Sequence, residues 1–126
     1  MNIENLKKSK KGFTLVEIIV VLVIIAILAA IAIPAMVGWI DKANQRAILA
    51  EARTVLLAAQ TLASESYGVG GAATVTAIDT KSLAGVSGTV EDISLSGASV
   101  NIITYKDTKW KATWTTSAWA ITKVTP

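Results

Sequence analysis

The longest feature in the hydrophobic pattern is an uninterrupted apolar run near the N-terminus. It extends from Ile18 to Ile40, 23 residues without a charged side chain. A helix needs about 20 such residues to cross the hydrocarbon core of a bilayer. The run therefore predicts a membrane-spanning helix over residues 13–40.

The next segment, residues 41–67, keeps helical spacing but becomes amphipathic. Its apolar positions form one stripe, made of Ile48, Ala52, Val55, Leu56, Ala59, Leu62 and Ala63. The remaining positions are largely polar and include Gln45, Arg46, Glu51, Arg53 and Gln60. Glycines follow Tyr67, so we expect the helix to end at about Ser66. The apolar stripe requires a cover from elsewhere in the chain.

The last third of the chain has the pattern of short strands. Residues 68–88 are rich in Gly, Ala, Thr and Ser and predict a connecting loop, with a short turn around Ser82 and Leu83. Residues 89–126 contain four β-branched and aromatic segments with short connections, namely 89–95, 98–106, 109–116 and 118–124. Short connections favour antiparallel neighbours. We expect an α+β fold in which a small sheet of three or four antiparallel strands packs on the long helix.

Charge and composition narrow the function. The full chain carries a net charge of +3, and residues 1–12 account for all of it, because four lysines there face only Glu4. The lysines precede the apolar run, which predicts a cytoplasmic N-terminus and an external C-terminal part. With neither Cys nor His, the chain lacks thiol nucleophiles, disulfides, histidine metal ligands and the commonest general base.

A lone carboxylate, Glu17, stands at the start of the apolar run. A cleaved secretory signal would have a shorter apolar stretch of roughly 7 to 15 residues. A plain single-span anchor fits the length, but it explains neither Glu17 nor the glycine, Gly12, between the lysines and the run. For Glu17 itself, one interpretation is that its side chain only extends towards the lipid headgroups.

The segment KKGFTLVE, followed by IIVVLVIIAILAAIAIPA, resembles the class III signal and N-terminal helix of type IV prepilins. That family also includes the pseudopilins of type II secretion and competence machines. The resemblance covers residues 7 to about 40 closely. It rests on the lysines, Gly12, Phe13, Thr14, Leu15, a Glu four residues after the Phe, and a long apolar helix containing Pro34.

The resemblance implies a sequence of events on this chain. A prepilin peptidase would remove residues 1–12 by cutting between Gly12 and Phe13, and would then N-methylate Phe13. The new α-amino group of one subunit would pair with Glu17 of its neighbour as the helices stack. The spacing of Phe13 and Glu17 places both on one helical face, and an intramembrane carboxylate calls for a named partner.

Pro34 has two interpretations. Proline cannot donate a hydrogen bond to the carbonyl of Ala30, so the helix should kink or loosen there, with added freedom from Gly38. One interpretation is an ordinary transmembrane kink. The other, implied by the resemblance, is local unwinding before Pro34 when subunits pack into a filament.

Other chemistry receives little support from the residues. The tryptophans at 110, 114 and 119, interleaved with Lys109 and Lys111, could stack single-stranded DNA or sugars, but the alternation is typical of a half-buried strand whose tryptophans enter the core. Glu91 and Asp92 supply too few oxygens for a calcium site. We expect no catalysis, no cofactor, no metal and no nucleic-acid partner.

The sequence thus favours a structural type IV pilus subunit for adhesion, surface motility or DNA uptake. The expected partners are other copies in a homo-oligomeric filament, the prepilin peptidase, and an assembly platform with its ATPase. The precursor would be a single-pass protein of the cytoplasmic membrane, and the mature subunit would lie in an extracellular pilus. A pseudopilin of a type II secretion or competence machine and a monomeric anchored binding module remain alternatives.

Overall fold

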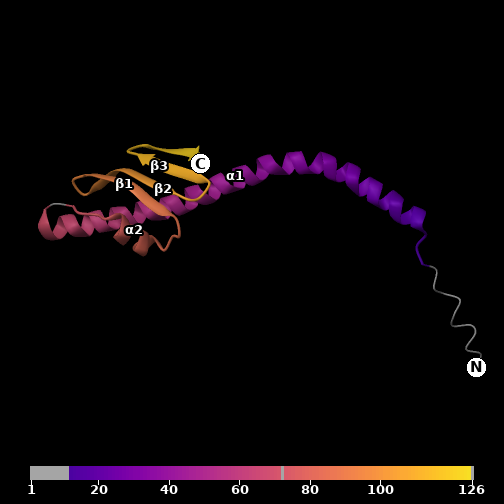
Figure 1. Ribbon diagram of the computed structural model, residues 1–126. Helices are drawn as coiled ribbons and strands as arrows, with labels where there is room; N and C mark the ends of the chain where they lie inside the picture. Colours follow the sequence, from indigo (N-terminus) through magenta and orange to yellow (C-terminus); the bar gives the residue numbers. More distant parts are fainter. Residues whose placement is uncertain (1–11, 72, 126) are drawn as a thin grey trace, which may run out of the picture. The chain divides into compact units, whose positions relative to one another are not determined.

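The computed structural model describes residues 12–71 and 73–125, which divide into two compact units between Trp39 and Ile40. The secondary structure consists of two helices and a four-stranded sheet over these residues (Figure 1). The elements are α1 (Leu15–Gly70), α2 (Ala77–Ala84), β1 (Thr89–Ser96), β2 (Ser99–Lys106), β3 (Trp110–Thr115) and β4 (Ala118–Lys123).

The first unit contains the apolar part of α1. Its most hydrophobic 18-residue window has a mean hydropathy of 3.3 and no buried residue. By length and composition alone, this helix could cross a membrane. Helical geometry continues through Pro34. The large side chains of this segment are exposed, and such an extended apolar surface is typical of a membrane or protein contact.

The second unit contains the sheet and the later part of α1. The four strands are antiparallel throughout and follow each other in the order β1-β2-β3-β4. Tight turns join them, and Gly97 takes a left-handed conformation, with φ of 61°, between β1 and β2. A register shift between Glu91 and Ser94 surrounds Asp92, whose φ is 51°, and marks a bulge in β1.

The core lies between α1 and one face of the sheet. The helix contributes Ile48, Ala52, Val55 and Ala59, which are nearly or fully buried. Leu56 packs against them and is partly buried. The sheet contributes Val90, Val100, Ile103, Tyr105, Trp110 and Ala112. The predicted α+β architecture, a long N-terminal helix packed on an antiparallel sheet, is confirmed, and the sheet has four strands.

The tryptophans of the sheet belong to this core. Trp110 is 8 % exposed, and Trp114 and Trp119 are partly buried against the cluster. The rings of Trp114 and Trp119 are paired across β3 and β4, with centroids 5.4 Å apart. The prediction that the alternating tryptophans enter the core is therefore confirmed, and they form no exposed stacking surface.

Two polar links tie α1 to the sheet. The Tyr105 hydroxyl donates to Glu51 Oε2 at 2.6 Å and accepts from the Gly88 N–H at 3.0 Å. The Gln60 amide donates to the Ala98 carbonyl at 2.8 Å and accepts from the Val100 N–H at 3.1 Å. Both links join positions far apart in sequence, so they fix where the helix lies on the sheet.

The segment that was expected to be a loop contains a helix. α2 begins after Thr76, whose hydroxyl accepts from the Asp79 N–H at 3.1 Å and donates to Asp79 Oδ2 at 2.6 Å. It ends at Gly85, where φ is 66° and the N–H donates to the Lys81 carbonyl. The prediction of only a short turn at Ser82 and Leu83 was wrong, because these two caps stabilise eight helical residues.

The predicted end of the long helix was also four residues early. α1 continues past Ser66 to Gly70. Gly68 and Gly70 are accommodated in its last turn, and the chain leaves the helix at Gly71, which has a φ of 72°. The Gly71 N–H donates to the Tyr67 carbonyl at 3.0 Å. The glycine that stops the helix is the one in the left-handed conformation.

Candidate functional site

The peptide bond between Gly12 and Phe13 lies before the first helical residue, Leu15. Both flanking residues are exposed, and the Phe13 side chain is 84 % exposed. A backbone outside regular structure is accessible to a peptidase, because no helical hydrogen bond must be broken before cleavage. The predicted leader, residues 1–12, lies outside the described residues except for Gly12.

Glu17 closes a hydrogen-bonded cap on the start of α1. The Thr14 N–H donates to Glu17 Oε2 at 3.1 Å, and the Glu17 N–H donates to Thr14 Oγ1 at 3.2 Å. This reciprocal arrangement is a capping box, which satisfies two N–H groups that have no partner within the helix. A carboxylate in the first turn also interacts favourably with the positive end of the helix dipole.

The capping box gives Glu17 a role that the sequence analysis did not assign. The signal was readable, because Thr followed three residues later by Glu before an apolar run is a capping sequence. The structure does not place Phe13 in the helix, so the i, i+4 relation between Phe13 and Glu17 is not formed in the described chain. Within residues 12–71 and 73–125, the only ion pair joins Lys106 to Glu91.

Pro34, the third predicted assembly residue, lies inside α1. Its apolar neighbours Ile33 and Met36 are exposed by 61 % and 58 %. The helix is unbroken here, so local unwinding at Pro34 stays a prediction about the assembled state. Gly38, one turn later, has open space around the position that a side chain would occupy.

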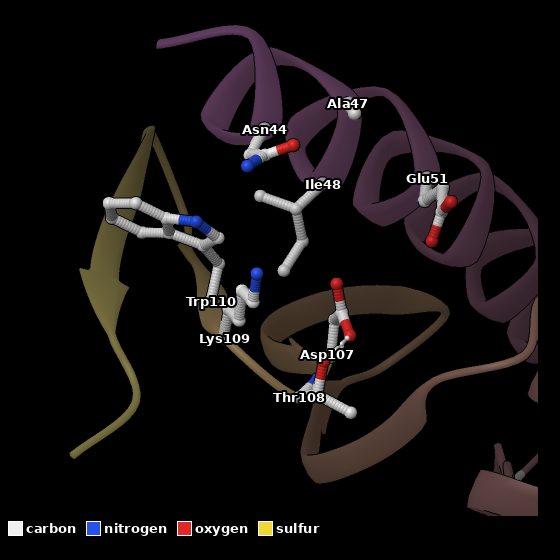
Figure 2. A pocket seen from close by; sticks show the side chains of 8 residues that line it. All are labelled: Asn44, Ala47, Ile48, Glu51, Asp107, Thr108, Lys109 and Trp110. Atoms are coloured by element: carbon white, nitrogen blue, oxygen red, sulfur yellow. Dashed lines mark hydrogen bonds between the residues drawn. The ribbon is translucent and has the colours of Figure 1, made fainter. Parts of the chain in front are cut away.

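The second unit, which we call the head, has a small hollow between α1 and the β2–β3 turn (Figure 2). Its volume is about 250 Å³. Asn44, Ile48 and Glu51 line it from the helix. Residues 107–109 line it from the turn, and Trp110 lines it from β3. Asp107 itself accepts hydrogen bonds from the backbone N–H and the hydroxyl of Thr108. These bonds hold the turn in place.

Glu51, which lines this hollow, uses its carboxylate to hold the sheet on α1. Glu51 accepts the hydroxyl proton of Tyr105 in a hydrogen bond, and burial together with this bond raises the pKa of Tyr105 to about 12. Over the described part of the chain, no group of three or more acidic, cysteine or histidine side chains could hold a metal ion.

The comparison with known protein families finds a match at the N-terminal end of the chain. Residues 7–33 match the family described as "Prokaryotic N-terminal methylation motif". No curated protein and no solved structure shows significant similarity to the chain. The chain therefore carries the N-methylation motif, or class III signal, typical of type IV pilins and pseudopilins. Type IV pilins and pseudopilins, in which this motif is typical, are generally structural proteins rather than enzymes.

Proposed function

We propose that the chain is the precursor of a type IV pilus subunit that becomes competent to assemble when its leader is removed. The observation that carries this proposal is the methylation motif over residues 7–33, in which the Gly12–Phe13 bond precedes a capped apolar helix. A prepilin peptidase cuts that bond and N-methylates Phe13. An assembly platform with its ATPase then extracts the subunit into a homo-oligomeric filament.

Before processing, the precursor spans the cytoplasmic membrane once. Four lysines within residues 1–12 hold the N-terminus in the cytoplasm, and residues 41–126 lie outside. Cleavage removes these lysines together with Gly12. The mature chain, beginning at Phe13, retains eight basic and eight acidic side chains. At its N-terminus, the new α-amino group replaces the four lysines as the cation that holds this end on the cytoplasmic side.

Glu17 has two successive partners in this mechanism. In the isolated subunit its carboxylate accepts the Thr14 N–H, as the geometry of the cap indicates. In the filament it pairs with the α-amino group of Phe13 of a neighbouring subunit. An ion pair at about 4 Å gains roughly 4 kcal/mol at an effective dielectric of 20. That gain offsets the cost of moving a carboxylate into the apolar helix bundle and fixes the axial register of neighbouring helices.

Pro34 supplies flexibility to the same bundle. The carbonyl of Ala30 has no proline N–H to bind, so the helix can loosen between these residues at lower cost than elsewhere in α1. We assign Pro34 a role in helix packing within the filament.

A pseudopilin of a type II secretion or competence machine is the alternative use of the same parts. A pilus subunit and a pseudopilin share the processing step and the packing of their N-terminal helices, and they differ in the length of the fibre that they form. Electron microscopy of cells that produce the chain distinguishes them: long surface fibres labelled by an antibody to the head support a pilus, whereas short fibres confined to the cell envelope support a pseudopilus.

Processing is tested by mass spectrometry of the N-terminus in cells that contain a prepilin peptidase. The expected product begins at Phe13 and carries one N-methyl group. Gly12→Val should leave residues 1–12 attached and stop assembly. Gly38→Val changes a glycine in the same segment away from the bond and should still be cleaved, since nothing lies near that position. A Gly12→Val chain that assembles normally would contradict the proposal.

A further inference from the structure

The apolar run near the N-terminus is flanked by two aromatic residues, Phe13 just before α1 and Trp39 within it. Between Phe13 and Trp39 every residue is aliphatic or small, apart from Thr14, Glu17, Pro34 and Met36. Trp39 is 77 % exposed. The remaining three tryptophans, at positions 110, 114 and 119, are buried or partly buried in the head.

The position of Trp39 matches the thickness of a bilayer. At a rise of 1.5 Å per residue, the 22 steps from Glu17 to Trp39 span about 33 Å. The hydrocarbon core is about 30 Å thick. When Glu17 lies at one boundary of the core, Trp39 lies at the other. The first charged residue after the apolar run, Asp41, follows two positions later.

The indole ring is suited to that boundary. It combines a large apolar surface with one N–H donor, and tryptophan is enriched where hydrocarbon meets the headgroup region. Ile40 and Val37 beside it are also exposed, at 53 % and 56 %, but they have no polar atom to hold them at a boundary.

We propose that Trp39 anchors the precursor at the outer membrane–water interface and thereby sets the depth of the helix. Its partner is the lipid headgroup region. The inference rests on the membrane-precursor part of the proposed function. With Trp39 held at the outer boundary, Glu17 and the nearby Gly12–Phe13 bond are held at the cytoplasmic boundary, where a peptidase can reach the bond.

Depth-dependent quenching of tryptophan fluorescence tests this position. The full chain is reconstituted at a low protein-to-lipid ratio into vesicles of phosphatidylethanolamine and phosphatidylglycerol. Separate samples contain lipids brominated close to the headgroup or close to the end of the acyl chain. Trp39→Phe identifies the part of the signal that belongs to Trp39. A double variant, Trp39→Phe with Leu28→Trp, moves the tryptophan to the middle of the span.

We expect shallow bromines to quench the wild-type chain more strongly than deep ones, and Trp39→Phe to lose that quenchable fraction. The double variant should reverse the order. Stronger quenching of Trp39 by deep bromines, or no quenching while the double variant is quenched, would overturn the anchor and leave the membrane-spanning proposal intact. Loss of quenching in both chains would instead overturn the membrane-spanning precursor itself.

A labelling experiment separates setting the depth from merely occupying the boundary. The chain has no native cysteine, so Leu15→Cys gives a single thiol near the cytoplasmic boundary. A thiol reagent that cannot cross the membrane is applied from the side of the N-terminus. The labelling rate should change several-fold when Trp39→Leu is added, and Trp39→Tyr should restore it. Equal rates in all three chains would overturn the depth-setting role.

Discussion

The hydroxyl of Tyr105 provides a sharp test of how the head is held on its helix. It donates to Glu51 Oε2 at 2.6 Å and accepts from the Gly88 N–H at 3.0 Å, and the Tyr105 side chain is 1 % exposed. Tyr105→Phe removes both bonds with little change in shape. A hydrogen bond to a charged group contributes about 1.5–3 kcal/mol, and the Gly88 N–H would also lose its acceptor. We expect the free energy of unfolding to fall by roughly 2–3 kcal/mol at pH 7.

The pH dependence gives a second, independent signature. The pKa of Tyr105 is raised from 10.0 to about 12 in the folded chain. Below pH 10 both the folded and the unfolded states keep the proton, so the stabilisation is fully present. Between pH 10 and pH 12 the unfolded state loses the proton first, and stability decreases with pH. A difference of two pKa units between the folded and unfolded states corresponds to roughly 3 kcal/mol of stability lost over this pH range. Tyr105→Phe has no hydroxyl at this position to titrate, so its stability should not show this loss.

Urea denaturation of the full chain in detergent micelles, followed by the fluorescence of the head tryptophans, measures both effects. Tyr67→Phe is the matched control, since Tyr67 is 46 % exposed, and it should alter stability by less than about 0.5 kcal/mol. The reasoning is refuted if Tyr105→Phe is as stable as the wild type at pH 7. It is also refuted if the two chains lose stability equally between pH 10 and pH 12.

Two further predictions concern the same head and the same assay. Gly88→Ala should destabilise it by about 1–3 kcal/mol, because an added Cβ would lie 2.5 Å from the Tyr105 hydroxyl and 2.6 Å from the Lys106 carbonyl; Gly70→Ala, in open space, should not. Equal stability of both variants would contradict this. Gln60→Ala should cost about 1–2 kcal/mol, because it removes two bonds to the β1–β2 hairpin, whereas exposed Thr61→Ala should have little effect. Amide exchange that does not increase at Val100 in Gln60→Ala would argue against this clamp.

The parts of the fold that follow from local pattern were predictable from the sequence. The apolar stripe through Ile48 and Val55 and the alternation around Trp110 and Trp114 reflect periodicities of helix and strand, and burial agrees with both. α2 was not predicted, because the composition of residues 68–88 is typical of a loop, although Thr76 and Asp79 form a capping pattern in the sequence.

Tertiary partners were not predictable in this way. Gln60 and Glu51 have the composition of a solvated helix face, and their roles depend on strand residues roughly 40 to 54 positions further along the chain. No local pattern reports such a contact. At the N-terminal site, the motif predicts roles for Gly12, Phe13 and Glu17. The capping sequence formed by Thr14 and Glu17 was also readable, and the geometry of the cap shows that it forms.

The cap also allows the pairing of Glu17 with a neighbouring subunit to be tested separately from its role in capping. Glutamine can replace glutamate in a capping box, so Glu17→Gln keeps the helix start but removes the charge that would pair with an α-amino group. The measurement is electron microscopy of filaments from cells that produce Glu17→Gln, alongside mass spectrometry of its N-terminus. We expect the Glu17→Gln chain to be inserted and cleaved after Gly12 yet to form no filaments. Normal filaments from Glu17→Gln would show that capping alone suffices and would contradict the pairing of Glu17 with the neighbouring subunit.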